Sequence, residues 1–379
     1  MSNKIYDIVI VGGGMAGISA AYRLAPHCSV LILERESQPA YHTTGRSAAM
    51  YMETYGTEQV LALTRASRPF FDQAVSSSFS ATPLLTPRGC IYVAAPEDKT
   101  RLLEFYEELR GYSPDNVQLL DKDQVMQLVP FMRPDKVVGG IYEEHAEDID
   151  VNVMLLSFLS GARAQGAEFR HSTTLESAER IDGIWHIKTS QGDSLLARTL
   201  VNAAGAWVDI VAERCGIKAI GFSPCRRSAF TFEAPTEIDL KNLVMVVDLM
   251  ENYYFKPDAG QFLGSPSNAD PTEAHDVVAE ELDIASGIYH IEENTTLKIP
   301  RPSHTWAGLR TFSPDKDLVI GHDPLHDGFF WLAGQGGYGI QSAPGVSELV
   351  ACLLLNKPLS EKLIEEGVKP EVISPARFR

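Results

Sequence analysis

The sequence has few cysteines, no long hydrophobic run and no excess of basic residues, and each absence argues against a class of protein. Its five cysteines are widely spaced and form no CxxC pair, so neither a zinc site nor a dithiol motif is expected, and no other metal site is predicted. No stretch of about 18 apolar residues occurs, so no transmembrane helix is expected. The formal net charge of −17 disfavours nucleic-acid binding, which requires a basic surface.

The N-terminal segment lacks a secretory pattern, because Asp7 interrupts its first apolar run. The odd number of cysteines fits a reducing cytosol. We therefore expect a cytoplasmic protein, or one attached peripherally to the inner membrane. At about 100–200 residues per domain, the length of 379 residues predicts two structural units.

Two kinds of segment alternate along the chain. An apolar strand, glycines and a helix pattern follow one another in 5–33, 199–215 and 329–355. Strand-like stretches with many turns occupy 89–94, 228–233, 243–248, 253–256 and 261–264. The pattern predicts an α/β fold, α+β overall, in which two domains are interleaved. A Rossmann-like domain comprises 1–50, 146–215 and 310–379, and a mainly antiparallel β-sheet domain comprises 51–145 and 216–309.

The first strand–glycine–helix segment carries a dinucleotide-binding fingerprint. A continuous apolar run at 8–11, typical of a buried parallel strand, precedes Gly12, Gly14 and Gly17. Gly12 makes the tight turn, Gly14 lets the backbone approach a pyrophosphate, and Gly17 lets the helix pack against the strand. Glu34, about 20 residues after Gly14, can accept hydrogen bonds from a ribose. The fingerprint alone does not separate FAD from NAD.

Three further segments favour a flavin. Residues 42–49 combine hydroxyls, a glycine and an arginine, and predict a helix start that faces a pyrophosphate. An ordinary N-capped helix that binds nothing would have a similar sequence. In 200–207 an apolar strand ends in small residues, as a close backbone or ligand requires. In 331–341 a strand enters a cluster of four glycines and then a helix, which would place a second helix N-terminus near a flavin or substrate.

In this order the motifs resemble the D-amino acid oxidase superfamily, which includes glycine and sarcosine oxidases and D-amino acid dehydrogenases. Within it the sequence most resembles bacterial FAD-dependent D-arginine dehydrogenases, over essentially the whole chain. The resemblance implies non-covalent FAD, since 311–321 lacks the cysteine to which sarcosine oxidases attach flavin. The motifs and the resemblance together place the cofactor at Gly12, Gly14, Ala16, Gly17, Glu34, Arg35, Thr43, Thr44, Gly45, Arg46, Ser47, Ala48, Leu175, Gly205, Gly337, Tyr338, Gly339 and Ile340.

Arg227 and Arg310 are the candidates for holding a substrate carboxylate, because a guanidinium makes two parallel charge-assisted hydrogen bonds to that group. The resemblance implies this role for both, and pocket positions for Tyr55 and Tyr254. Arg226 is expected to be solvated, since alternate strand residues face opposite sides. The predicted catalytic residues are Tyr254, Arg310 and Tyr55. The predicted substrate-binding residues are Arg227, Tyr254, Arg310, Tyr55, Met50, Gly337 and Gln341.

The sequence departs from the D-arginine dehydrogenases at two positions. Gly89 and Cys90 align with the glutamate that holds the guanidinium of their substrate, and Met50 aligns with a histidine beside their flavin. Both changes remove polarity. A buried cation without a partner is costly, so a neutral side chain is expected to fit better.

The leading hypothesis is FAD-dependent oxidative deamination of a D-amino acid, in which hydride leaves the α-carbon and the imino acid hydrolyses to a 2-oxo acid. Electrons would pass to a quinone or to oxygen. One alternative is a glycine- or sarcosine-type amine oxidase that uses oxygen. Another is a 2-hydroxy acid dehydrogenase, against which the lack of an evident histidine base counts. A non-enzymatic flavoprotein would leave the paired arginines and tyrosines without a purpose.

Overall fold

The strand–glycine–helix segments build one largely parallel sheet in the computed structural model, which describes residues 4–379. At its centre β1 (Ile5–Val11) lies between β2 (Val30–Leu33) and β12 (Ser194–Asn202), parallel to both. Two more parallel strands pair with these, β9 (Glu168–Arg170) and β20 (Phe329–Ala333). Antiparallel strands complete it: β10 (Leu175–Ile181), β11 (Ile184–Thr189) and β19 (Val319–His322).

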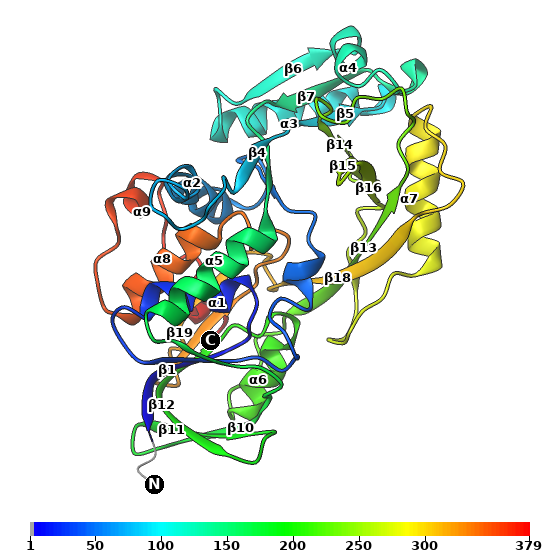
Figure 1. The fold of residues 1–379 in the computed structure, drawn as a ribbon. Helices are drawn as coiled ribbons and strands as arrows, with labels where there is room; N and C mark the ends of the chain where they lie inside the picture. The colour runs from blue at the N-terminus through cyan, green and yellow to red at the C-terminus, as the bar shows by residue number, and fades with distance from the viewer. Residues whose placement is uncertain (1–3) are drawn as a thin grey trace.

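Both faces of this sheet are covered at its centre, which explains the continuous apolar runs at 8–11 of β1 and throughout β2. Ile8 and Ile10 face the helices α1 (Met15–Leu24), α5 (Val151–Ala164) and α8 (Ala343–Leu354). Val9 and Val11 face α6 (Val208–Arg214) and the β10–β11 hairpin, on the other side in Figure 1. Two helices pack outside this layer, α2 (Glu58–Asp72) and α9 (Glu361–Glu365).

A second, nine-stranded sheet carries the turn-rich segments. All its strand pairs are antiparallel except that of β5 with β14. Its strands are β5 (Cys90–Ala94), β6 (Val117–Asp121), β7 (Gly139–Glu143), β13 (Ser223–Phe232), β14 (Met245–Asp248), β15 (Tyr254–Asp258), β16 (Gln261–Ser265), β17 (Asp270–Pro271) and β18 (His304–Phe312). Three helices flank it, α3 (Lys99–Tyr112), α4 (Lys122–Leu128) and α7 (Glu281–Asn294). The predicted fold class, a Rossmann-like unit with a mainly antiparallel sheet, is confirmed.

A small third sheet was not predicted. It consists of β3 (Met50–Tyr51), β4 (Leu85–Pro87) and β8 (Glu147–Ile149), and its strands are too short to show a sequence period. Within the described part of the chain five 3-10 turns complete the elements: η1 (Thr43–Arg46), η2 (Pro96–Asp98), η3 (Pro134–Lys136), η4 (Gly205–Trp207) and η5 (Pro375–Phe378). The predicted domain boundaries stay a prediction, and two of them fall inside strands: the one between 50 and 51 divides β3, and the one between 309 and 310 divides β18.

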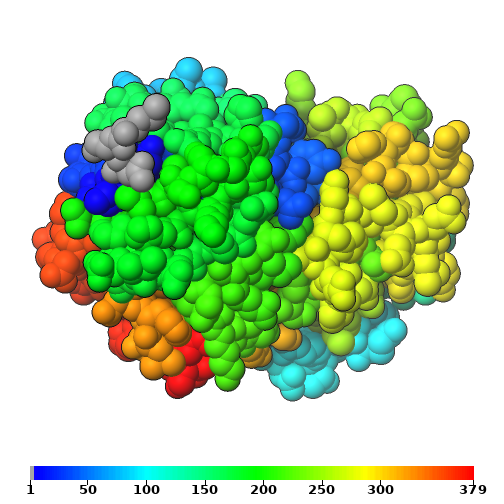
Figure 2. Space-filling view, turned by 90° about the horizontal axis from the view of Figure 1, so that it is seen from below, coloured from blue at the N-terminus to red at the C-terminus, as the bar shows by residue number. Residues whose placement is uncertain are grey.

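The long antiparallel pair β13 and β18 reaches from the second sheet toward the first (Figure 1). Seen from below, the molecule has two lobes, and a segment of the chain near residue 50 lies between them (Figure 2). In residues 4–379 no helix combines the length and the apolar character that a membrane crossing requires.

Candidate active site

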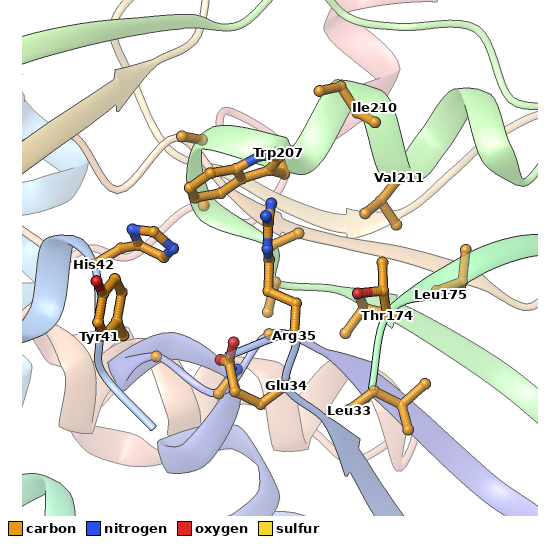
Figure 3. Close-up of a pocket in the computed structure, with 18 of the residues that line it drawn as sticks. Leu33, Glu34, Arg35, Tyr41, His42, Thr174, Leu175, Trp207, Ile210 and Val211 are labelled. Atoms are coloured by element: carbon orange, nitrogen blue, oxygen red, sulfur yellow. The ribbon is translucent and has the colours of Figure 1, made fainter. Parts of the chain in front are cut away.

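Three adjoining cavities run from the parallel sheet to the second sheet. The first, of about 340 Å³, opens above the β1–α1 turn (Figure 3). The second, of about 140 Å³, shares Gly14, Thr43, Thr44, Ala203 and Gly205 with the first. The third, of about 80 Å³, shares Arg227, Tyr254 and Arg310 with the second. An elongated cofactor can therefore occupy the first two cavities with one end beside the third.

The fingerprint glycines lie where their predicted roles require them. A Cβ on Gly12, whose φ is +117°, would stand 2.3 Å from the carbonyl oxygen of Ala203. A Cβ on Gly17 would stand 2.1 Å from the carbonyl oxygen of Gly12, so Gly17 lets α1 pack against the turn and does not line a cavity. Gly14 faces the cavities, at the N-cap of α1, where free N–H groups favour a phosphate.

Glu34 directly follows β2 and lies at the floor of the first cavity. Its carboxylate oxygens accept hydrogen bonds from the N–H groups of Gly13 and Glu36, both at 2.8 Å. Burial raises its pKa, and the two N–H groups act in the opposite direction. The Arg35 guanidinium lies 4.6 Å from the ring centre of Trp207 and forms a wall opposite Leu175 (Figure 3). This combination of a carboxylate and flat apolar walls suits a nucleoside.

The η1 turn, predicted as the start of a helix, is a single 3-10 turn that links both sheets. The Thr44 hydroxyl accepts a hydrogen bond from the N–H of Met15, the first residue of α1, at 3.1 Å. The Thr43 hydroxyl donates to the Leu309 carbonyl of β18 at 2.6 Å. Its neighbours Ser47 and Ala48 line the second and third cavities. The turn thus forms one wall of the proposed flavin site.

Four of the predicted cofactor residues have a supporting position. Gly17, Gly45 and Tyr338 do not line the first two cavities, and Arg46 lines the second, but its guanidinium is already paired. The Arg46 guanidinium donates to the carbonyls of Val277 and Ala307 and pairs with Asp276, so it ties η1 to the second sheet. Gly45 packs against Ala40, and Gly17 against Gly12. The Tyr338 ring packs edge-on against Tyr55, with ring centres 4.9 Å apart. The others line the first or second cavity: Gly12, Gly14, Ala16, Glu34, Arg35, Thr43, Thr44, Ser47, Ala48, Leu175, Gly205, Gly337, Gly339 and Ile340.

Unpartnered polar atoms mark the second cavity as a ligand site. Of the buried side-chain polar atoms in residues 4–379 that lack a hydrogen-bond partner, three belong to its lining: Arg227 Nε, Thr311 Oγ1 and Gln335 Nε2. Leaving such atoms unpaired costs free energy, so a polar ligand is the expected partner. The carbonyls and ring nitrogens of a flavin fit these donors. The sequence motifs did not identify Thr311 and Gln335, although Gln335 lies within the glycine cluster at 331–341.

All seven predicted substrate-binding residues line the third cavity: Met50, Tyr55, Arg227, Tyr254, Arg310, Gly337 and Gln341. The strand register explains how the two arginines meet. Arg227 of β13 pairs with Gly308 of β18, and Arg310 is two residues further along, on the same face of the sheet. A Cβ on Gly308 would point at η1 instead, 3.5 Å from the Cβ of Arg46. The roles of these residues in binding stay a prediction.

The two guanidiniums give the third cavity a positive charge, and the Glu251 carboxylate, which also lines it, forms no ion pair with either of them. The Arg310 Nη1 atom donates to the Tyr55 hydroxyl at 2.9 Å, and neither arginine forms an ion pair within residues 4–379. Burial lowers the pKa of Arg227, and the charge of Arg310 adds to this effect. An anion bound between them would relieve this repulsion.

Arg226 contradicts its sequence-based prediction. It points to the opposite face of β13 from Arg227, as alternation requires, but it is not solvated. Its side chain is 13% exposed and its Nε lies 2.8 Å from the Asp283 carboxylate, with Glu280 on the other side. The acidic start of α7 covers this face, which alternation along one strand does not predict.

The rest of the third cavity is largely apolar, and its residues were mostly missed. Gly89 and Cys90, expected to face the substrate, do not line it, and Cys90 is fully buried. Tyr92, two residues along β5, lines it instead. The other missed lining side chains include Met52, Met245, Val247, Ser267 and Glu251. Glu251 lies in a tight turn with a φ of +56°, and supplies a carboxylate where none was expected.

Comparison with known proteins identifies the family of this chain. The family model described as DAO, FAD dependent oxidoreductase, matches residues 7–353. Dimethylglycine dehydrogenase of Homo sapiens is 24% identical over 384 residues, which are 95% of this chain and 43% of that protein. The chain thus spans less than half the length of this relative. Glycine oxidase of Geobacillus kaustophilus is 23% identical over 364 residues, 93% of each chain.

A solved structure shares the fold. The crystal structure of L-proline dehydrogenase from P. horikoshii superposes with a TM-score of 0.85 and 19% identity, over 99% of this chain and 98% of that one. These comparisons support the superfamily that the motifs predicted, and they do not distinguish a D-arginine dehydrogenase within it. The chain belongs to the DAO family of FAD-dependent oxidoreductases, and its cofactor is FAD.

Proposed function

We propose that this protein oxidises a small α-amino acid or N-alkylated amino acid at the carbon that bears the amine. The observation that carries the proposal is the pair Arg227 and Arg310, converging on a cavity that adjoins the proposed flavin site. A carboxylate is the anion that two guanidiniums hold best, because each can make two parallel hydrogen bonds to it. FAD when bound supplies the hydride acceptor.

The side chains around the cavity would orient the substrate for this reaction. With the carboxylate between the arginines, the hydroxyls of Tyr55 and Tyr254 lie on the same cavity and can add hydrogen bonds. The Gly337 carbonyl is a candidate acceptor for the amine. Such fixed positioning supplies much of the rate enhancement when no covalent step is required. The imino acid that results would hydrolyse to a 2-oxo acid, or to glyoxylate from a glycine.

The size of the cavity favours a glycine-type substrate. Its volume of about 80 Å³ is far below the roughly 300–1,000 Å³ of typical ligand pockets. Relatives named for glycine and dimethylglycine also resemble this chain. A D-amino acid with a small apolar side chain is the second candidate, because Met50, Met245 and Val247 form an apolar lining.

The electron acceptor, quinone or oxygen, stays a prediction, as do the cytoplasmic location and a peripheral attachment to the inner membrane. A role in amino acid catabolism follows only if the reaction is confirmed. The absence of a covalent flavin link is likewise a prediction, which acid precipitation of the holoprotein tests, since non-covalent FAD would stay in the supernatant.

Anaerobic mixing with a substrate panel tests the function. The panel contains glycine, N-methylated glycines, D- and L-amino acids and 2-hydroxy acids, and flavin bleaching reports reduction. Rapid bleaching by glycine or its N-methyl forms supports the leading proposal, and bleaching by apolar D-amino acids supports the second. Bleaching only by hydroxy acids, or by nothing in the panel, would reject both. Admission of air after reduction separates an oxidase from a dehydrogenase.

A further inference from the structure

A fully buried carboxylate lies behind the third cavity. Glu143 is the last residue of β7 and has no exposed surface. It accepts hydrogen bonds from the N–H of Glu53 at 2.7 Å, from the Thr54 hydroxyl, and from Asn116 Nδ2 at 3.3 Å. Within residues 4–379 no cation pairs with it. Burial of an unpaired carboxylate is costly, so its presence calls for a reason beyond packing.

The position of Glu143 connects two cavities. On one side Glu143 lies opposite Cys90 of β5, so Tyr92, two residues further along β5, shares its face of the sheet and lines the third cavity. Thr54, which donates to Glu143, also acts on the phenol of Tyr92. On the other side Glu53 and Asn116 line a solvent-open cavity of about 560 Å³. The hydroxyls of Tyr92 and Thr54 therefore lie between the proposed substrate site and the Glu143 carboxylate. Two other neighbours of Glu143, Glu53 and Asn116, line a cavity that is open to water.

The proposed reaction requires such a path. An amino acid carries an ammonium group at neutral pH, and its nitrogen must lose a proton for hydride to leave the adjacent carbon. Arginines cannot accept that proton, and no histidine is among the residues that line the third cavity within 4–379.

Resting on the proposed function, we propose that Glu143 takes up the proton that the substrate ammonium loses, relayed through the hydroxyls of Tyr92 and Thr54. An N–H bond of the ammonium breaks and its proton binds the Tyr92 oxygen, while the phenol's own proton moves to Thr54. The Thr54 proton moves to a carboxylate oxygen of Glu143. Both hydroxyls end neutral, and Glu143, now a carboxylic acid, releases its proton to water in the outer cavity.

The acid–base properties of the line are consistent with this role. Burial raises the pKa of Glu143 to about 7, although its hydrogen-bond donors act in the opposite direction and the Glu53 carboxylate adds to the rise. Burial also raises the pKa of Tyr92 well above its ordinary value, so the phenol keeps a proton to pass on. Burial, with a contribution from Glu143, raises the pKa of the adjacent Cys90, which stays a thiol. The remaining titratable neighbour, His145, follows β7 at the surface.

The test compares pH profiles of the holoenzyme and its variants with the best substrate from the panel. For the unaltered enzyme we expect kcat/KM to rise with pH along a limb near pH 7. Glu143→Gln should abolish that limb and lower kcat at pH 8 by on the order of 100-fold, with a smaller change in KM. Glu143→Asp should retain the limb, and Tyr92→Phe should lower kcat by a similar factor. Glu179→Gln, an exposed glutamate of β10, is the matched control.

A second readout does not depend on turnover. Infrared difference spectra of the substrate-free holoenzyme, titrated through pH 7, should show a carboxylic acid band that Glu143→Gln removes. A variant that fails to fold is recognised by a lost flavin spectrum, and Tyr92→Phe and Glu143→Asp then carry the test. An unchanged limb in Glu143→Gln, or the absence of the band, would overturn the relay alone. A panel in which no amino acid bleaches the flavin rejects the proposed function and the relay with it.

Discussion

Arg310 and Tyr55, which lie 255 positions apart in the sequence, share a hydrogen bond of 2.9 Å from Nη1 to the phenol oxygen. The Tyr55 backbone is held from the other side, because its carbonyl accepts a hydrogen bond from Gln341 Nε2 at 3.1 Å. Three distant segments thus meet at the third cavity, and the tyrosine fixes the orientation of the guanidinium that is proposed to bind the carboxylate.

Tyr55→Phe removes this contact and leaves one guanidinium N–H without its partner. A hydrogen bond to a charged group contributes about 1.5 kcal/mol, so KM for the amino acid should rise about tenfold. Steady-state kinetics measure the change, and Tyr289→Phe, at an exposed position of α7, is the matched control. An unchanged KM would mean that Tyr55 does not orient Arg310.

Arg310→Lys keeps the charge and removes the planar fork. Lysine cannot make two parallel hydrogen bonds to a carboxylate, so we expect KM to rise more than tenfold while the flavin spectrum persists. Flavin reduction at a series of substrate concentrations gives the apparent affinity. Arg198→Lys, in which an exposed arginine of β12 is replaced, should behave as the unaltered protein. Equal affinities for both variants would contradict the carboxylate clamp.

Glu251→Gln tests whether the carboxylate at the third cavity selects among side chains. Removal of its charge should lower the ratio of kcat/KM for cationic over neutral amino acids by about fivefold, the effect of one partly exposed charge pair. Glu233→Gln, an exposed glutamate after β13, is the control. If the ratio is unaffected, Glu251 does not contact the substrate side chain.

Gly17→Ala should separate α1 from the turn beneath it. Its new Cβ would stand 2.1 Å from the Gly12 carbonyl oxygen, and relief of such crowding costs about 1–3 kcal/mol. We expect less FAD bound per chain and a lower Tm, measured by absorbance and calorimetry. Gly111→Ala, in α3 with no atom within 4 Å of the new methyl, should be neutral or stabilising.

Glu143 should also affect the pH dependence of stability. Its pKa is about 7 in the folded protein and about 4.5 in the unfolded chain, so the folded state holds the proton more tightly. Its contribution to stability is therefore lost as pH rises, by about 2 kcal/mol between pH 5.5 and 8. Urea unfolding of the unaltered protein and of Glu143→Gln should diverge by this amount. Parallel pH profiles would show that Glu143 does not titrate in this range.

Much of the nucleotide-binding half was predictable because its signals are local. The apolar runs of β1 and β2 and the glycines at 12, 14 and 17 each depend on a few neighbouring residues. The structure has these elements at the predicted places. Arg227 and Arg310 were identified by resemblance, and the register of β13 with β18 explains why they converge.

The remainder depended on contacts between segments that are far apart in the sequence. Tyr92, Glu251 and Glu143 show no periodic or motif signal, since each gains its importance from what packs against it. Arg226 was predicted to be solvated, because nothing along its own strand reveals the acidic start of α7.

By itself the sequence determined the cofactor half of this protein, because hydrogen bonding and sterics within a strand–turn–helix unit are settled over about thirty residues. Only the tertiary structure decided which side chains enclose the substrate cavity, how small it is, and where a buried carboxylate lies behind it. Those properties arise where the second sheet meets the segments at 47–55 and 337–341, and side-chain burial across such an interface is not encoded in any single segment.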